Sequence, residues 1–297
     1  MKSRITLLLI AAFVLNLAAS AQLKKRIAIS RFEDRSGSGF SHLGSGVADM
    51  LATALVKSGK FAVIERQELD KLVQEQKLGE SGLVTAQTAP KVGQLLGAEL
   101  FVVGAVTECG TKESNIGGGV SVFGGGLKTK KARTVVDIRL INTSTGEIIA
   151  SEAEEGTEST TGIAVRYEDM DFNNQDSWDN TDIGKATREA VDKTIELISK
   201  NMEKIPWSGK IIKVNTDGTV LMKPGSEGNV TKGSVFFVVR KGEEIKDPDT
   251  GLSLGAEESK VGKIKTTDDL LQGKAMKATI LEGNGFQVGD IVRDKEK

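Results

Sequence analysis

The sequence predicts an α+β protein: an α/β-like sheet covered by helices, with possible β-hairpin insertions, followed by a small all-β barrel. Between Arg26 and Thr107, apolar strand patterns alternate with amphipathic helix patterns, which is typical of a sheet covered by helices. From Trp207 onward, short strand patterns recur between turn residues, which favours a small barrel. Since the chain has 297 residues, two domains are expected, and we predict them at residues 22–205 and 207–297.

Residues 1–21 have the pattern of a secretory signal peptide. Basic residues precede a short apolar stretch, and Ala19-Ser20-Ala21 is a small-x-small cleavage site. The sequence therefore predicts cleavage between Ala21 and Gln22, export from the cytoplasm and no lipid anchor. The apolar stretch is shorter than the ~20 residues that a membrane-spanning helix needs, so we expect the mature chain in the periplasm or at the outer membrane.

The predicted sheet begins with a strand at residues 26–32, followed by a Gly- and Ser-rich loop at 34–41. An amphipathic helix comes next and ends before Gly59, because glycine is typical of the left-handed position that closes a helix. We predict that the apolar stripe of this helix packs on the sheet. The stripe consists of Leu43, Val47, Met50, Leu51, Ala54 and Leu55. The elements after it are a strand at 61–64, a helix at 65–76, a helix capped by Thr88 and an apolar strand at 99–107.

Residues 110–131 form a Gly-rich insertion after the last of these strands. Apolar residues alternate with serine and glycine there, which is the pattern of a β-hairpin. Such a hairpin is just long enough for two membrane-spanning strands of ~9–11 residues each. A flexible soluble loop is the alternative, because runs of glycine weaken strands and three lysines lie near the return limb. The candidate membrane residues are Ile116, Val120, Val122 and Phe123.

Two strand patterns flank the turn at 142–146 and predict a further β-hairpin. The segment 153–182 that follows is acidic and polar. Because carboxylates are costly on a lipid-facing surface, Asp169 and Asp171 favour a solvated loop over a second membrane hairpin, unless the charged face lines a wide aqueous lumen.

The longest helix is predicted at residues 183–205, with Asp182 as its N-cap and Pro206 at its end. The barrel that follows is predicted from six short strands separated by Gly-containing turns, one of them at Lys241-Gly242. These strands are expected at 209–215, 219–222, 234–240, 260–265, 274–280 and 290–293.

The sequence predicts no catalytic, cofactor-binding or metal-ligating residue, and therefore no enzyme. His42 is the only histidine, and without a nucleophile pair around it we interpret it as a loop or cap residue. Cys109 is the only cysteine, so it forms no intramolecular disulfide. We expect a partly buried small residue there, and a reactive or intermolecular thiol is the alternative. A formal net charge of −1 gives no indication of a nucleic-acid partner.

Three segments are distinctive in combination: Ile64–Leu72, Leu96–Val106 and Val136–Ile149, the last containing N-T-S-T-G-E-I. Their order and spacing resemble those of the CsgG/HfaB family of curli-secretion channels, over roughly residues 25–204. The strand and turn pattern of residues 207–297 is similar to the C-terminal SH3-like barrel of the flagellar protein FlgT, which implies an interaction module rather than a catalyst.

The family resemblance implies a ring of identical subunits at the outer membrane that handles a secreted polypeptide or other envelope proteins. It also implies that the first membrane hairpin lies at residues 110–131. The curli channel has a lipid-modified cysteine at its mature N-terminus, and a Tyr, an Asn and a Phe narrow its channel. The loop at 34–43 keeps only Phe40 of these three, so we predict Phe40 as the candidate constriction of a wider opening. The alternative is a soluble periplasmic binding or scaffold protein with the same fold and no membrane barrel.

Overall fold

The computed structural model describes residues 22–64, 92, 96–116, 127–161, 178, 180–246, 248 and 253–296. Several predictions concern segments outside these residues. They are the signal peptide before Gln22, the helix at 65–76, the cap at Thr88, the membrane residues Val120, Val122 and Phe123, and the acidic pair Asp169 and Asp171.

The first part of the chain is a six-stranded sheet in the order β3–β1–β4–β5–β6, with β2 paired to β4. Strand β1 runs parallel to β3 and β4, whereas β4, β5 and β6 are antiparallel neighbours. With two described helices on it, this mixed sheet confirms the predicted α+β class. The strands are β1 (Lys25–Ile29), β2 (Glu33–Asp34), β3 (Phe61–Val63), β4 (Leu100–Ile116), β5 (Leu127–Asn142) and β6 (Ile148–Thr161).

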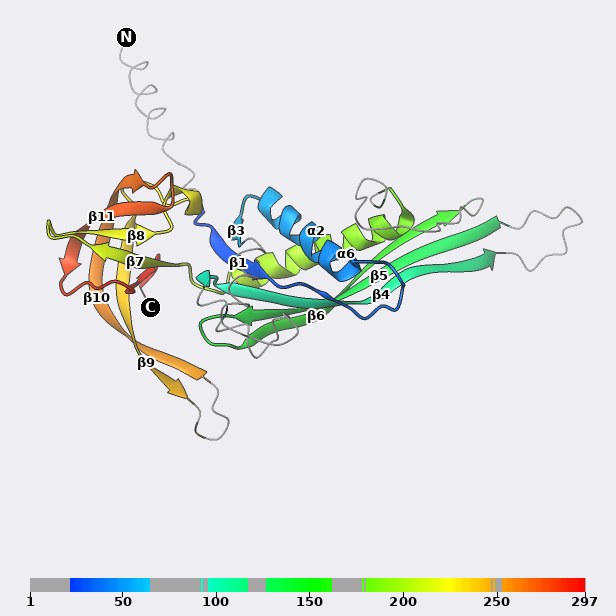
Figure 1. Cartoon of the computed structure of the whole chain (residues 1–297), viewed down its shortest axis with the longest axis horizontal. Helices are drawn as coiled ribbons and strands as arrows, with labels where there is room; N and C mark the ends of the chain where they lie inside the picture. The colour runs from blue at the N-terminus through cyan, green and yellow to red at the C-terminus, as the bar shows by residue number, and fades with distance from the viewer. Residues whose placement is uncertain are drawn as a thin grey trace, which may run out of the picture.

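Helices α2 (Leu43–Lys57) and α6 (Asp182–Met202) pack together on one face of this sheet (Figure 1). The predicted stripe of α2 is confirmed: of its members, only Ala54 is not fully buried. Thr181, and not Asp182, is the N-cap of α6, because its hydroxyl accepts a hydrogen bond from the Gly184 amide at 2.9 Å. The Asp182 carboxylate instead accepts a hydrogen bond from the Thr160 hydroxyl.

Strand β6 corrects the predicted loop at 153–182, because regular pairing with β5 continues to Thr161. Strand β6 is an edge strand of the sheet and carries four glutamates. Charged side chains are common on such strands because they discourage pairing with other chains. Along the chain described here, no helix is both long and apolar enough to cross a membrane.

The C-terminal part is the predicted small barrel, which is closed, with its strands in the order β10–β11–β8–β7–β12–β9. Trp207 and Phe236 lie at its core, with ring centroids 5.1 Å apart. The predicted turn at Lys241-Gly242 is wrong, since both residues continue β9, where Lys241 pairs with Glu258 of β10. The strands are β7 (Ser208–Val214), β8 (Thr219–Lys223), β9 (Val235–Lys246), β10 (Ser253–Leu270), β11 (Ala275–Gly283) and β12 (Ile291–Arg293).

Candidate functional site

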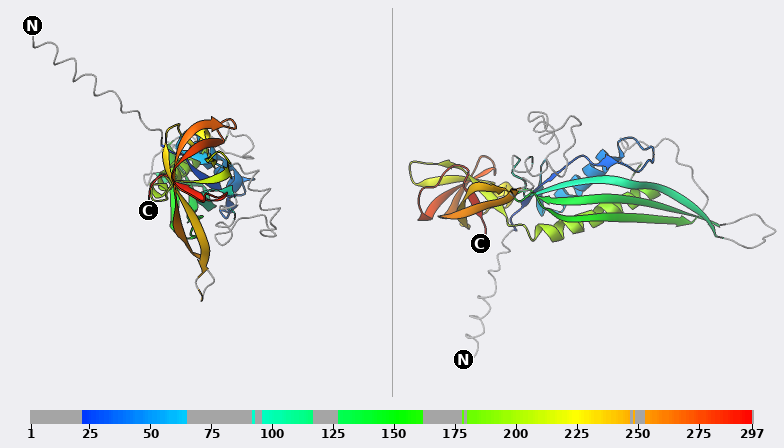
Figure 2. Two further views of the ribbon diagram at one scale, coloured as in Figure 1. Left: turned by 90° about the vertical axis from the view of Figure 1, so that its left-hand side faces the viewer. Right: turned by 90° about the horizontal axis from the view of Figure 1, so that it is seen from below.

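Strands β4 and β5 continue beyond the helices that cover this layer and, with the end of β6, form a projecting sheet (Figures 1 and 2). The pairing of β4 with β5 runs from Leu100 opposite Asn142 to Ile116 opposite Leu127, with one irregularity after Val106. Ile116 is therefore the last residue of the described ladder, and the other candidate membrane residues lie beyond it. The two strands of the predicted hairpin are therefore paired as far as Ile116 and Leu127.

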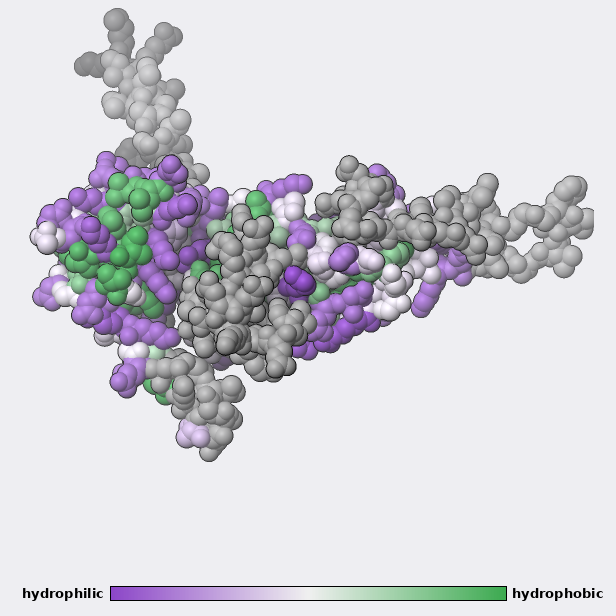
Figure 3. Space-filling model, in the orientation of Figure 1, coloured by the Kyte–Doolittle hydropathy of each residue, from purple (hydrophilic) through white to green (hydrophobic). Residues whose placement is uncertain are grey.

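The projecting sheet carries charges on both faces. Lys112 lies opposite Lys131, and the next pair along the ladder is Glu113 opposite Lys130. Because successive side chains point to opposite faces of a sheet, these neighbouring pairs place charge on each face. In the view of Figure 3, hydrophilic residues line the lower margin of the sheet. This part of the sheet therefore has a surface suited to water.

Ion pairs connect the three strands across the face that points away from α6. The Arg133 guanidinium on β5 forms ion pairs with Glu108 of β4 and with Glu155 of β6, the latter at 2.9 Å. The hydrogen bond between Arg133 and Glu155 lowers the pKa of the Glu155 carboxyl. These side chains are largely solvent-exposed, so the pairs add little to stability.

The edge of β6 is partly occupied by side chains from α6. The Glu189 carboxylate accepts a hydrogen bond from the backbone N–H of Thr157 at 2.8 Å, and the Lys193 ammonium donates to the backbone carbonyl of Glu155 at 2.6 Å. Glu189 and Lys193 also form an ion pair with each other. The two side chains therefore take the place of a neighbouring strand at this point of the edge.

Cys109 lies beneath α6 on the other face of the sheet. Its sulfur accepts a hydrogen bond from the Thr134 hydroxyl at 3.8 Å, and Thr134 is hydrogen-bonded to Thr187 of α6 at 3.0 Å. Burial raises the pKa of the Cys109 thiol to about 11. The prediction of a buried small residue is confirmed, and a thiol in these surroundings is a poor nucleophile.

We expect native Cys109 to resist alkylation by iodoacetamide at pH 8. With a pKa of about 11, only on the order of one thiol in a thousand is ionised at that pH, and the thiolate is the reactive form. Urea-unfolded protein should react at the rate of an ordinary cysteine. Equal rates of labelling for native and unfolded protein, followed by mass spectrometry, would show that the thiol is accessible after all.

Phe40 packs inward in this structure. Its ring meets Trp178 edge to face, with centroids 5.1 Å apart, and it lies against the core under α2 and α6. His42 is the N-cap of α2 and adopts a left-handed conformation with φ 59°. His42 is thus a cap residue as interpreted, and a role of Phe40 at a channel rim stays a prediction.

Glu99 joins the sheet to the barrel. Its carboxylate is 4% exposed and accepts hydrogen bonds from the Arg26 amide at 2.5 Å and from the Ser208 amide and hydroxyl at 3.2 and 3.1 Å. Burial raises the pKa of the Glu99 carboxyl, and the positive charge of Arg26 opposes this shift. The indole of Trp207 adds a second link by donating to the Lys24 carbonyl at 3.2 Å.

Glu99→Ala should lower the free energy of unfolding by about 1–3 kcal/mol, because it leaves the partly buried Arg26 and Ser208 amides without an acceptor. The variant should also lose the part of the pH dependence of stability that Glu99 causes in the wild-type protein. The folded state holds the Glu99 proton more tightly than the unfolded chain, so stability falls as pH rises from the ordinary value of 4.5 through the raised pKa. Urea unfolding at several pH values measures both effects. The exposed Glu147, substituted in the same way, is the control, and equal losses for the two variants would contradict this account.

Comparison with known proteins gives one family and several relatives. Residues 9–224 match the family model described as curli production assembly/transport component CsgG. A lipoprotein of Neisseria meningitidis serogroup B is 29% identical over 185 residues, which cover 58% of this chain and 75% of that protein. The curli component CsgG of Escherichia coli K12 is 33% identical over 108 residues, which cover 34% of this chain and 39% of that protein. The chain thus spans well under half the length of this curli relative.

Among solved structures, a hypothetical protein of Chlamydia trachomatis superposes with a TM-score of 0.40 at 16% sequence identity. The superposition covers 60% of this chain and 97% of that one. A likeness of this size carries no argument about function.

Proposed function

The chain belongs to the CsgG family of curli production assembly/transport components and is an envelope protein with the CsgG-like fold, and on that premise we propose how it acts. Its subunits associate in a ring and take part in the secretion or assembly of a polypeptide at the outer membrane. The observation that carries this proposal is the projecting sheet. It occupies the position where the family is expected to have its first hairpin, and it continues past the helices as a paired ladder that ends with Ile116 opposite Leu127.

The sheet offers what a ring needs. A ring forms when one surface of each subunit binds a different surface of the next, and the sheet presents two different sides beyond α6. Strand β6 is at one edge of the β4–β5–β6 layer, and the projecting part of β4 is at the other. Side chains of α6 cover the edge of β6 around Thr157. The contact between subunits therefore lies at the strand ends that are farther from the helices.

A second candidate is a periplasmic scaffold that assembles without inserting into the membrane. The charges at Lys112, Glu113, Lys130 and Lys131 favour it, because Lys or Arg on a lipid face costs about 2–4 kcal/mol each at the bilayer midplane. The stretch between Glu113 and Lys130 is shorter than two spanning strands of ~9–11 residues each.

Cell fractionation separates the two candidates. The secretion proposal expects recovery of the protein from the outer-membrane fraction only with detergent, whereas the scaffold expects release by osmotic shock without detergent. If the purified protein conducts in planar bilayers, Phe40→Ala should raise the single-channel conductance. Stable insertion with unchanged conductance would remove Phe40 from the channel, and failure to insert would favour the scaffold.

A further inference from the structure

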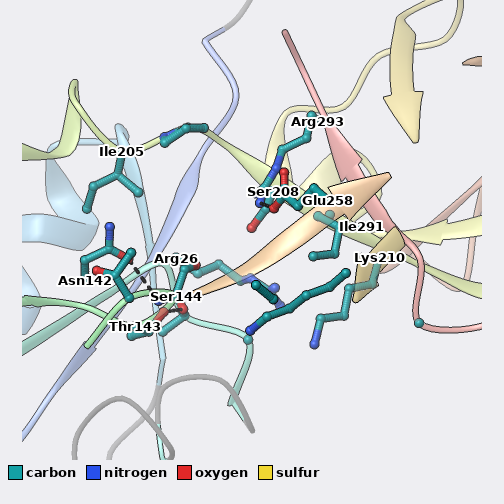
Figure 4. Close-up of a pocket in the computed structure, with 18 residues that line it drawn as sticks. Arg26, Asn142, Thr143, Ser144, Ile205, Ser208, Lys210, Glu258, Ile291 and Arg293 are labelled. Carbon is teal, nitrogen blue, oxygen red and sulfur yellow. Dashed lines mark hydrogen bonds and ion pairs between the residues drawn. The ribbon is translucent and has the colours of Figure 1, made fainter. Parts of the chain in front are cut away.

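A cavity of about 430 Å³ lies between the sheet and the barrel. Arg26 approaches it from β1, Lys210 from β7, and Ser144 belongs to the loop after β5 (Figure 4). Sites for small molecules usually have volumes of ~300–1,000 Å³ and often lie between domains. The cavity is therefore large enough for a ligand of modest size.

Positive charge predominates in the lining of the cavity. Arg26, Lys210, Lys241 and Arg293 contribute cations, and Glu258 is the carboxylate among the lining residues. Glu258 is already bound to Arg293 at 2.8 Å. Glu99 lies close to Arg26, but its carboxylate is engaged by the two amides described above. Within the described ranges, Arg26, Lys210 and Lys241 form no ion pair.

The ammonium group of Lys210 is in an electrostatically unfavourable position. Lys210 is half-buried, and burial lowers the pKa of its ammonium, with further lowering by the positive charges of Lys223, Arg26 and Lys241. Like charges placed together in a partly buried site are unfavourable unless an anion offsets them. The arrangement is therefore costly for the folded protein without a ligand.

Two arginine atoms give a second, independent indication. The Nε atoms of Arg26 and Arg293 are buried and have no hydrogen-bond partner within the part of the chain that the structure describes. Buried donors are nearly always paired in native proteins, so each of these two Nε atoms needs an acceptor, which a bound ligand can supply. Gly97 leaves room for the guanidinium of Arg26, because a β-carbon at Gly97 would lie only 2.6 Å from its Nη2 atom.

From these observations we propose that the cavity binds a phosphate group carried by a small molecule or by a lipid headgroup. The planar guanidinium of arginine matches phosphate oxygens in paired hydrogen bonds, and a neighbouring lysine adds a compact charge. A phosphate dianion offsets two of the three cations that form no ion pair. The site joins residues of both units, so the ligand also holds the barrel against the sheet.

Calorimetric titration of the full chain with inorganic pyrophosphate, at constant ionic strength, tests this proposal. We expect saturable binding and a rise in melting temperature. Lys210→Gln should weaken binding by roughly tenfold or more, while it raises the melting temperature of the ligand-free protein because it relieves repulsion. Lys213→Gln is the matched control, since Lys213 lies on the same strand, is exposed and does not line the cavity.

Three results would overturn the proposal. They are no binding of pyrophosphate, equal weakening by the two lysine substitutions, or equally tight binding of succinate. Sedimentation with vesicles containing phosphatidic acid identifies the source of the phosphate. Pelleting that pyrophosphate and Lys210→Gln both reduce indicates a lipid headgroup, and pyrophosphate binding without pelleting indicates a soluble phosphate compound.

Discussion

Gly156→Ala should lower the free energy of unfolding by about 3 kcal/mol, at the upper end of the cost of overpacking. Gly156 lies on β6 directly beneath α6. A β-carbon there would overlap the carbonyl oxygen of Ala186 and lie 2.7 Å from the Ala190 nitrogen. Because both are backbone atoms of a helix, they cannot move aside as the end of a side chain can. The whole helix must lift from the sheet to admit one methyl group.

Gly110→Ala is the matched control for this prediction. Gly110 is also a glycine of the β4–β5–β6 layer, on β4, but no atom lies within 4 Å of the position that its β-carbon would take. Alanine fits a strand at least as well as glycine, so this variant should unfold at the wild-type urea concentration. A Gly156→Ala protein as stable as the Gly110→Ala protein would mean that α6 does not pack on β6 as described.

Leu51→Ala should destabilise the protein by about 2–5 kcal/mol, as other truncations of buried leucine do. Leu51 is 0% exposed and lies in the core between α2 and the sheet. The substitution removes apolar contacts and leaves a cavity that the rigid sheet cannot close. Val56→Ala on the same helix is the comparison, because Val56 is 59% exposed and its loss should change stability by less than about 0.5 kcal/mol. Equal melting temperatures for the two variants would mean that the face of α2 with Leu51 does not pack on the sheet.

Local patterns sufficed for most of the fold. The stripe of α2 and the barrel strands could be predicted because helical and strand periodicities are set by which side chains must be buried. The turn at Lys241-Gly242 was wrong because glycine there serves packing and not chain reversal. A β-carbon at Gly242 would lie 3.3 Å from the Glu257 carbonyl oxygen of the neighbouring strand. The length of β6 was missed because its second half is acidic and polar, and so lacks the apolar alternation that marks a strand in the sequence.

The candidate sites were less accessible to sequence reasoning, since each joins distant segments. Glu99 stands out in the sequence only as a charge at the start of an apolar strand. Its partners Arg26 and Ser208 are 73 and 109 residues away. The phosphate cavity likewise takes its cations from β1, β7, β9 and β12, and no local motif connects them. Lys210 and Lys241 lie within their strands and resemble the many other lysines of the barrel, so the sequence offered no signal for this site.

The central claim is that the projecting sheet assembles subunits of this protein into a ring, and the mass of the assembled protein tests it most directly. Native mass spectrometry of the full chain should show one closed homo-oligomer. A variant in which a short turn replaces residues 114–128 should show monomers that melt at the wild-type temperature, since the helices and core remain intact. A monomeric full-length protein at micromolar concentration, or an oligomer unchanged by the shortened sheet, would contradict the account.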